Sequence, residues 1–264
     1  MIHRHSQILE TLRLNGQCSV EELSRKFGVS DMTIRRDLKA LEIAGQLLRT
    51  HGGAAMGERV AFEFAFMERT QQSREAKQAI AQAAFAQLGS AKTILIDSGT
   101  TTLALADRLR EAPDLTVVTT SLPIASALQF SEGVDVLLLG GMLRHGSPDL
   151  IGPLTETNLE QLHADVAFIG ADAVDENGQA YNESLPVARM LQKMTSAADR
   201  FYIMADSSKL GRRALACIVK AGAGAGLITD SGIAPGIHRS LKSAGVNVII
   251  APLKTPKRKP AKKK

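Results

Sequence analysis

Residues 19–54 read SVEELSRKFGVSDMTIRRDLKALEIAGQLLRTHGGA, and this stretch decides the fold of the first part of the chain. Ser19, followed three residues later by Glu22, forms a capping box, so a helix is predicted to run from there to about Phe27. Gly28-Val29-Ser30 favours a tight turn, and its serine can cap a further helix. Two short helices around a glycine turn are typical of a helix-turn-helix.

The helix that follows the turn separates apolar from basic residues. Ile34, Leu38 and Leu41 recur at helical spacing, so they form one buried stripe. At 100° per residue, Arg36 and Lys39 point away from that stripe, with Thr33 and Arg35 on its flanks. An ordinary amphipathic helix with a solvated face would show the same pattern. The cap, the turn and the basic helix in this order favour a helix that reads the major groove of DNA.

The segments on either side complete a small domain over residues 1–56. Residues 5–14 carry an apolar stripe and predict a first helix, which Asn15-Gly16 ends. Residues 47–53, LLRTHGG, combine strand-forming residues with a glycine pair, which is the pattern of a wing that could touch phosphates. The candidate DNA-binding residues are Ser30, Thr33, Arg35, Arg36, Lys39, Arg49 and His51.

The net charge of +5 is unevenly distributed along the 264 residues. Residues 1–59 carry 9 Lys/Arg against 7 Asp/Glu, whereas residues 254–264 carry 7 basic residues and no acidic one. The overall basicity therefore belongs mostly to the tail, which we expect to be disordered and either solubilising or weakly attracted to phosphate. Aromatic content of 4% without Trp argues against binding of single-stranded nucleic acid.

Residues 57–72 are predicted to be a linker, and residues 73–253 a second domain. Phe62, Phe64 and Phe66 alternate in the linker and suggest an extended segment. After a helix over 73–88, seven short aliphatic runs alternate with helical patterns. These predicted strands cover 93–97, 116–120, 134–141, 165–170, 201–206, 226–229 and 247–251. The pattern predicts an α/β fold with a doubly wound, mostly parallel sheet.

Polar residues gather where the predicted strands end, and ligands bind at that edge of such sheets. The first three ends supply Asp97, Ser98, Gly99, Thr100, Thr101, Thr102, Thr120, Ser121, Leu122, Gly140 and Gly141. A glycine turn that opens a helix suits an anion such as phosphate. The motif is neither a Walker loop nor a dinucleotide fingerprint, so no cofactor is expected.

Later strand ends add acidic residues and one lysine. GADAVDENG at 170–178 supplies Asp172 and Asp175, and ADSSKLG at 205–211 supplies Asp206 and Lys209. A lysine compensates phosphate charge, and carboxylates can bind sugar hydroxyls. Alternatively, Asp206 caps the turn that follows it and Lys209 is solvated. The six histidines and two cysteines show no metal-ligand spacing.

TIRRDLKALE followed by RTHGGA resembles the DeoR-type family of bacterial transcriptional regulators. IDSGTTT, LLLGGMLR and ADSSKLGR extend the resemblance to the family's sensor domain, so that it covers residues 5–253. It implies a winged helix-turn-helix that binds double-stranded operator DNA, usually as a repressor and as a dimer or tetramer. It also implies a phosphorylated sugar or polyol as effector.

The sensor domain is similar to sugar-phosphate isomerases, in which a GAD-x-VD stretch like that of Asp172 and Asp175 carries active-site aspartates. Their later Lys-Gly-Gly-Gly-Gly stretch and catalytic Glu have no counterpart here, so binding without turnover is expected and no catalytic residue is assigned. The alternative is an isomerase or deaminase with an appended DNA-binding module. An activator is equally compatible with the residues. Leu185-Pro186-Val187 stands where the family usually has an acidic residue.

No segment of the sequence reaches the roughly 18 apolar residues of a membrane helix. Together with the two distant cysteines, this leads us to expect a cytoplasmic protein without a membrane partner.

Overall fold

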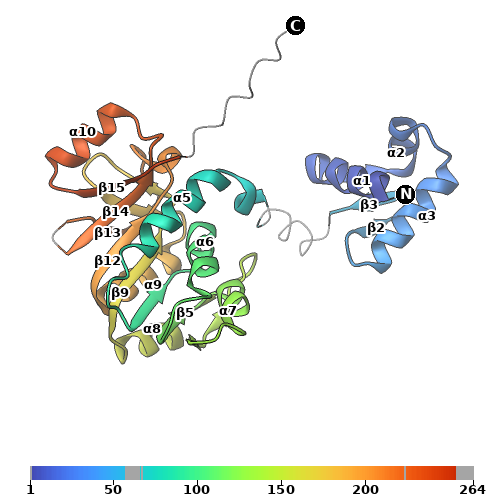
Figure 1. Ribbon diagram of the computed structural model, residues 1–264. Helices are drawn as coiled ribbons and strands as arrows, with labels where there is room; N and C mark the ends of the chain where they lie inside the picture. The colour runs from blue at the N-terminus through green and yellow to red at the C-terminus, as the bar shows by residue number, and fades with distance from the viewer. Residues whose placement is uncertain (1, 57–65, 67, 223, 254–264) are drawn as a thin grey trace, which may run out of the picture. The chain divides into compact units, whose positions relative to one another are not determined.

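A computed structural model describes residues 2–56, 66, 68–222 and 224–253, and the chain divides into two compact units, Met1–Arg69 and Thr70–Lys264 (Figure 1). Residues 57–65 and 67 of the predicted linker lie outside the described residues, Phe62 and Phe64 among them, and so does the basic tail. Phe66 lies in a helical turn rather than in an extended segment.

The first unit is a three-helix domain with a small sheet. Its helices are α1 (Ile2–Asn15), α2 (Val20–Phe27) and α3 (Asp31–Ile43), and its strands are β1 (Gln17–Ser19), β2 (Leu48–Thr50) and β3 (Gly53–Ala55). Ser19 and Glu22 form both bonds of the predicted capping box, and Gly28 adopts a left-handed conformation with φ of 64° at the turn. Aliphatic side chains of all three helices form the core, among them the predicted stripe on α3.

The wing has three strands, one more than predicted. Strand β3 pairs antiparallel with β2 and also with β1, which follows α1 directly. Gly53 permits this pairing because a Cβ atom there would lie 2.2 Å from the carbonyl oxygen of Cys18. The close approach of β3 to β1 therefore requires glycine and joins the hairpin of β2 and β3 to the segment between α1 and α2.

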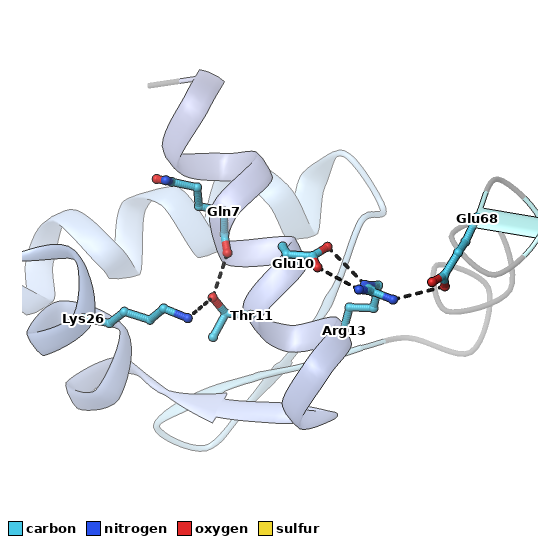
Figure 2. Close-up of polar contacts among 6 residues, drawn as sticks. All are labelled: Gln7, Glu10, Thr11, Arg13, Lys26 and Glu68. Carbon is cyan, nitrogen blue, oxygen red and sulfur yellow. Dashed lines mark hydrogen bonds and ion pairs between the residues drawn. The ribbon is translucent and has the colours of Figure 1, made fainter. Parts of the chain in front are cut away.

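Polar contacts on α1 join it to two other segments of the first unit (Figure 2). The Nζ of Lys26, at the end of α2, donates to Thr11 Oγ1 at 2.9 Å, and Thr11 in turn donates to the carbonyl of Gln7 at 2.8 Å. Arg13 forms two hydrogen bonds to Glu10 and a third, of 3.1 Å, to Glu68. The last contact ties the segment that leaves the first unit to the end of α1.

The second unit is built on a seven-stranded sheet in which every neighbouring pair is parallel. In order across the sheet its strands are β15 (Asn247–Ala251), β14 (Ala225–Asp230), β12 (Ala198–Met204), β9 (Ala164–Gly170), β4 (Thr93–Ile96), β5 (Leu115–Thr119) and β6 (Val134–Leu138). All seven predicted aliphatic runs correspond to strands of this sheet, and β4, β5, β9 and β14 are apolar nearly throughout because both of their faces are covered.

Helices cover both faces of the sheet, as predicted for a doubly wound fold. One face packs against α5 (Arg74–Phe85), α6 (Thr100–Leu109) and α7 (Leu122–Leu128), and the other against α8 (Pro153–Glu160), α9 (Leu185–Ser196) and α10 (Pro235–Ser243). The chain runs from β4 outward to β5 and β6, then returns to place β9 on the other side of β4. The order of the strands therefore reverses between β4 and β9.

Two small antiparallel sheets were not predicted. They comprise β7 (Met142–Leu143) with β8 (Leu150–Ile151), and β10 (Ala173–Val174), β11 (Gln179–Asn182) and β13 (Ala216–Lys220). Strands β7, β8 and β10 have two residues each and are too short to show an alternating pattern. Within the described residues, none of the helices combines the length and hydropathy that crossing a membrane requires.

Candidate DNA-binding surface and effector site

Helix α3 presents its basic residues to solvent. Ile34, Leu38 and Leu41 are buried, whereas Arg35, Arg36 and Lys39 are exposed and Thr33 is half-buried. Among the described residues, none of the three basic side chains donates to a protein acceptor. An uncommitted row of cations on one helix face suits contact with an anionic partner.

The turn and the wing hold their candidate residues differently. Ser30 Oγ accepts the Thr33 N–H at 3.3 Å and lies 3.0 Å from Thr33 Oγ1, so both hydroxyls take part in capping α3. Arg49 Nε donates to the Gly53 carbonyl at 3.2 Å, and its Nη1 donates to the carbonyl of Arg35 at 3.4 Å. His51 is exposed at the tip of the wing. Arg49 thus links the wing to α3, which the sequence pattern did not reveal.

Asp37, on the inner side of α3, is a buried charge that sequence reasoning missed. Its Oδ2 accepts Arg4 Nε at 2.6 Å, and its Oδ1 lies 3.2 Å from His5 Nε2, so two residues of α1 meet it. Burial alone raises the pKa of this carboxyl, but the hydrogen bonds from Arg4 and His5 outweigh it and hold the pKa below its usual value. This contact fixes α1 against α3.

In the second unit, the strand-order reversal between β4 and β9 coincides with the first polar strand end. Asp97 follows β4, and its Oδ2 accepts the N–H of Gly170, the last residue of β9, at 3.0 Å. Asp172 lies two residues farther along and is half-buried. Clefts at such reversals are where ligands bind in open α/β sheets.

The glycine turn after Asp97 contains residues that solvent reaches and residues whose side chains are buried in the protein. Gly99 is the N-cap of α6 and provides no side-chain cap, and Ser98, Gly99 and Thr100 are half-buried. Thr102, by contrast, is buried and donates to the carbonyls of Asp97 and Gly99, at 2.7 and 2.8 Å. Thr101 is also buried. The start of this turn, rather than its threonine run, is therefore the accessible part.

The next two strand ends lie beside this turn. Ser121 is buried and caps α7 by accepting the N–H of Ile124, and the buried Thr120 hydroxyl has no hydrogen-bond partner among the described residues. Leu122 and Gly140 are exposed, and Gly141 is half-buried. The neighbouring strands β6, β5, β4 and β9 thus bring most of the candidate effector residues to one edge.

The remaining acidic candidates are largely engaged in the fold. Asp206 is buried and accepts the N–H and hydroxyl of Ser208, which caps the 3-10 helix η1 (Ser207–Lys209). Asp175 is buried and accepts two backbone N–H groups, the Tyr181 hydroxyl and Arg213 Nε. Asp172 accepts the Glu183 N–H at 3.0 Å. Lys209 is half-buried next to the end of β12.

Asp149 and Arg144 belong to this region, although sequence reasoning did not single them out. Asp149 is fully buried and pairs with Arg144, whose Nη2 lies 2.9 Å from Oδ1. Burial, assisted by the charge of Asp149, raises the pKa of Asp97 to about 6, against the opposing N–H bonds from Gly170 and Ser98. A carboxyl in this state can exchange a proton when a ligand binds.

The raised pKa of Asp97 predicts a pH-dependent stability. The folded protein binds this proton more tightly than the unfolded chain, so the contribution is present below about pH 4 and is lost as pH rises to about 6. A difference of roughly two units corresponds to about 3 kcal/mol. Urea unfolding of the wild type and Asp97→Asn between pH 4 and 7 should therefore show free energies that diverge by that order. Parallel profiles would contradict the raised pKa.

Residues 185–187 lack the acidic residue that the family usually has there, and they form the start of α9. Leu185 is exposed at the start of α9, and Val187 is buried in the core. Arg189 on the same helix pairs with Glu156 of α8 at 2.9 Å, so an acidic partner is supplied from another helix. Within the described residues, no group of three or more His, Cys, Asp or Glu side chains is arranged to hold a metal ion.

A winged helix-turn-helix joined to a doubly wound α/β unit with a polar strand edge defines a class of DNA-binding regulator with a sensor domain. Family comparison agrees with both parts. Residues 4–60 match the DeoR-like helix-turn-helix domain, and residues 72–231 match the DeoR C-terminal sensor domain. The chain belongs to the DeoR family.

Relatives match along most of the chain. A putative aga operon transcriptional repressor of Escherichia coli O157:H7 is 33% identical over 94% of this chain and 93% of the relative's length. The glycerol-3-phosphate regulon repressor of Escherichia coli K12 is 32% identical over 80% of this chain and 84% of the relative's length. Among solved structures, a D-ribose-5-phosphate isomerase in complex with phospho-erythronic acid aligns with a TM-score of 0.38 at 21% identity, covering 51% of this chain and 52% of that one.

Proposed function

We propose that the protein is a transcriptional repressor that binds double-stranded operator DNA and whose binding is modulated by a phosphorylated sugar or polyol. The observation that carries the DNA-binding part is the outward face of α3, where Arg35, Arg36 and Lys39 are exposed and uncommitted. Relatives named as repressors of the aga operon and of the glycerol-3-phosphate regulon support the regulatory part.

Within the first unit, α3 enters the major groove and the wing contacts the backbone. Arg35, Arg36 and Lys39 reach base edges or phosphates, with Thr33 at the start of the helix. His51 at the wing tip contacts phosphate, while Ser30 and Arg49 position these elements through the bonds they form to the protein. The unit carries a small net charge, so tight binding requires more than one copy, as a dimer or tetramer.

Within the second unit, the phosphate lies at the start of α6, beside Ser98, Gly99 and Thr100. Gly99, the N-cap residue of α6, provides no side-chain cap, and this supports the position because an anion can take the place of a cap at a helix N-terminus. Asp97, Asp172 and Lys209 border the same edge and suit sugar hydroxyls and phosphate charge. Ligand binding that differs between the DNA-bound and free forms shifts their populations.

A thermal-shift screen of the full chain against phosphorylated and unphosphorylated sugars and polyols tests the effector. We expect one phosphorylated compound to raise the melting temperature and to change operator affinity, because a ligand that binds the native state stabilises it by mass action. Ser98→Ala, Gly99→Ala and Thr100→Ala in combination should abolish the shift while leaving ligand-free operator binding intact. A shift that is equal for both forms of the sugar would contradict the phosphate site.

A further inference from the structure

The β6 side of the large sheet ends in an open edge. β6 pairs with β5, and no other strand among the described residues pairs with its far side. The N–H of Leu139 donates to the Thr119 carbonyl, toward β5. Since successive residues of a strand point their backbone groups in opposite directions, those of Val136 and Leu138 face the open edge.

Exposed apolar side chains surround this edge. Six large ones, exposed by 38 to 67%, come from β6, the β7–β8 hairpin and the first residues of α7 and α8. They are Leu122, Leu137, Leu138, Met142, Leu143 and Leu154. We call this set the edge patch. Helix α8 belongs to it because α8 contacts β8 and because Leu154 lies 3.6 Å from the position of a Cβ atom on Gly140, which follows β6.

The edge patch is large enough for a protein interface. At about 100 Å² of apolar surface for each fully exposed side chain, it offers roughly 300 Å². A little over half of a typical interface is apolar, so the corresponding area is about 500 Å² on each partner and about 1,000 Å² in total, which is the size that a specific interface reaches. Patches beyond a few hundred Å² on a soluble protein mark interaction sites.

We propose that the edge patch binds a second copy of this chain, with the two β6 strands antiparallel across a two-fold axis. An edge strand is self-complementary in that arrangement, because each backbone donor meets the partner's acceptor. β6 contains neither the Pro nor the Lys that commonly blocks an open edge, and its one charged residue is Asp135. The inference rests on the oligomer of the proposed function and assigns its surface.

The interface borders the candidate effector site. Leu122 belongs both to the edge patch and to the candidate effector residues, and Gly140, another candidate effector residue, lies beside Leu154 of the patch. A second copy bound to the edge patch therefore lies next to the candidate effector site. Ligand binding and association are consequently linked, and each changes the affinity of the other by the same factor.

Light scattering and sedimentation of the full chain over a range of concentrations test the surface. We expect the wild type to have a mass of about 56 kDa, twice the 28.2 kDa of one chain. Leu138→Glu, on β6, and Met142→Glu, in the hairpin outside the large sheet, should each weaken association at least tenfold. Ile250→Glu is the matched control, because Ile250 is also 38% exposed but lies on β15, at the opposite edge. Circular dichroism and melting curves verify that the variants fold.

The outcomes separate this inference from the proposed function. A dimer that Leu138→Glu and Met142→Glu split, but Ile250→Glu does not, supports the edge patch, as does a tetramer that they reduce to dimers. If the wild type is a dimer that neither Leu138→Glu nor Met142→Glu affects, or that only Ile250→Glu splits, the edge patch is not the dimer interface. The proposed function as a repressor is unaffected by that result. A wild type that is monomeric at all concentrations, or that associates only with a different protein, overturns the second copy as occupant.

Discussion

Replacing Arg36 with alanine is expected to lower operator affinity by about 1–3 kcal/mol for each half-site, or roughly five- to 150-fold. Arg36 lies on the face of α3 opposite the buried stripe of Ile34 and Leu38, and it has no acceptor among the described residues. Loss of its guanidinium therefore removes the proposed DNA contact without disturbing the fold. Fluorescence anisotropy with labelled operator, at several salt concentrations, measures the effect.

A matched control is Arg110→Ala, which removes the same charge from an exposed position at the end of α6. We expect it to leave operator affinity within twofold of the wild type. Comparison of the wild type and Arg36→Ala on operators with single base changes separates the two kinds of contact. A base contact relaxes preference at one position, whereas a phosphate contact weakens all sequences equally. Unchanged affinity and unchanged preference would exclude Arg36 from the groove.

Replacing Arg4 with alanine is expected to reduce the unfolding free energy of the first unit by more than the loss of an exposed ion pair does. The Asp37 side chain is only 1% exposed, so removal of Arg4 leaves a buried carboxylate whose remaining charged contact among the described residues is His5. Because the pKa of Asp37 is lowered in the folded state, the contribution of the pair is present above about pH 4. It is lost as the pH falls below that value. Urea unfolding at pH 7 and pH 3 measures both effects.

Arg13→Ala is the control for this variant, since Arg13 is on the same helix and pairs with the exposed Glu10 (Figure 2). Exposed pairs contribute about 0–1 kcal/mol, so its effect should be small. Removal of both groups in Arg4→Ala/Asp37→Ala should recover part of the stability lost in Arg4→Ala, because no unpaired charge remains buried. Equal effects of Arg4→Ala and Arg13→Ala would show that burial of Asp37 does not determine the cost.

Sequence pattern predicted the parts of the fold that depend on burial and on local capping. The aliphatic runs of β4, β5, β9 and β14 are predictable because a strand covered on both faces needs apolar residues throughout. The capping box of Ser19 and Glu22 is predictable because its partners are three residues apart. The candidate effector residues were predictable because they follow the predicted parallel strands directly. In the structure β4, β5 and β6 are neighbours, so the carboxyl ends of these strands lie together.

Other features depend on contacts between distant residues and leave no local signal. Asp37 lies in α3 next to Leu38 and could equally be solvated; its partner Arg4 is 33 positions away. Asp149 follows a glycine-containing loop and has no periodic neighbours, yet its burial beside Arg144 influences Asp97 across the sheet edge. An aspartate at position 206 could cap a turn or bind a ligand, and the sequence alone does not distinguish these two roles. The structure shows Asp206 as the cap of η1.

The bond from Arg49 to the carbonyl of Arg35 has a consequence for how operators are discriminated. It joins the wing to α3, so in the proposed complex the depth of the helix in the groove is coupled to the position of the wing on the DNA backbone. The distance between phosphates across a groove varies with local base composition. We therefore expect base pairs that touch no side chain to alter how well α3 reads their neighbours, so that the preferred operator extends beyond the bases that the arginines are proposed to contact.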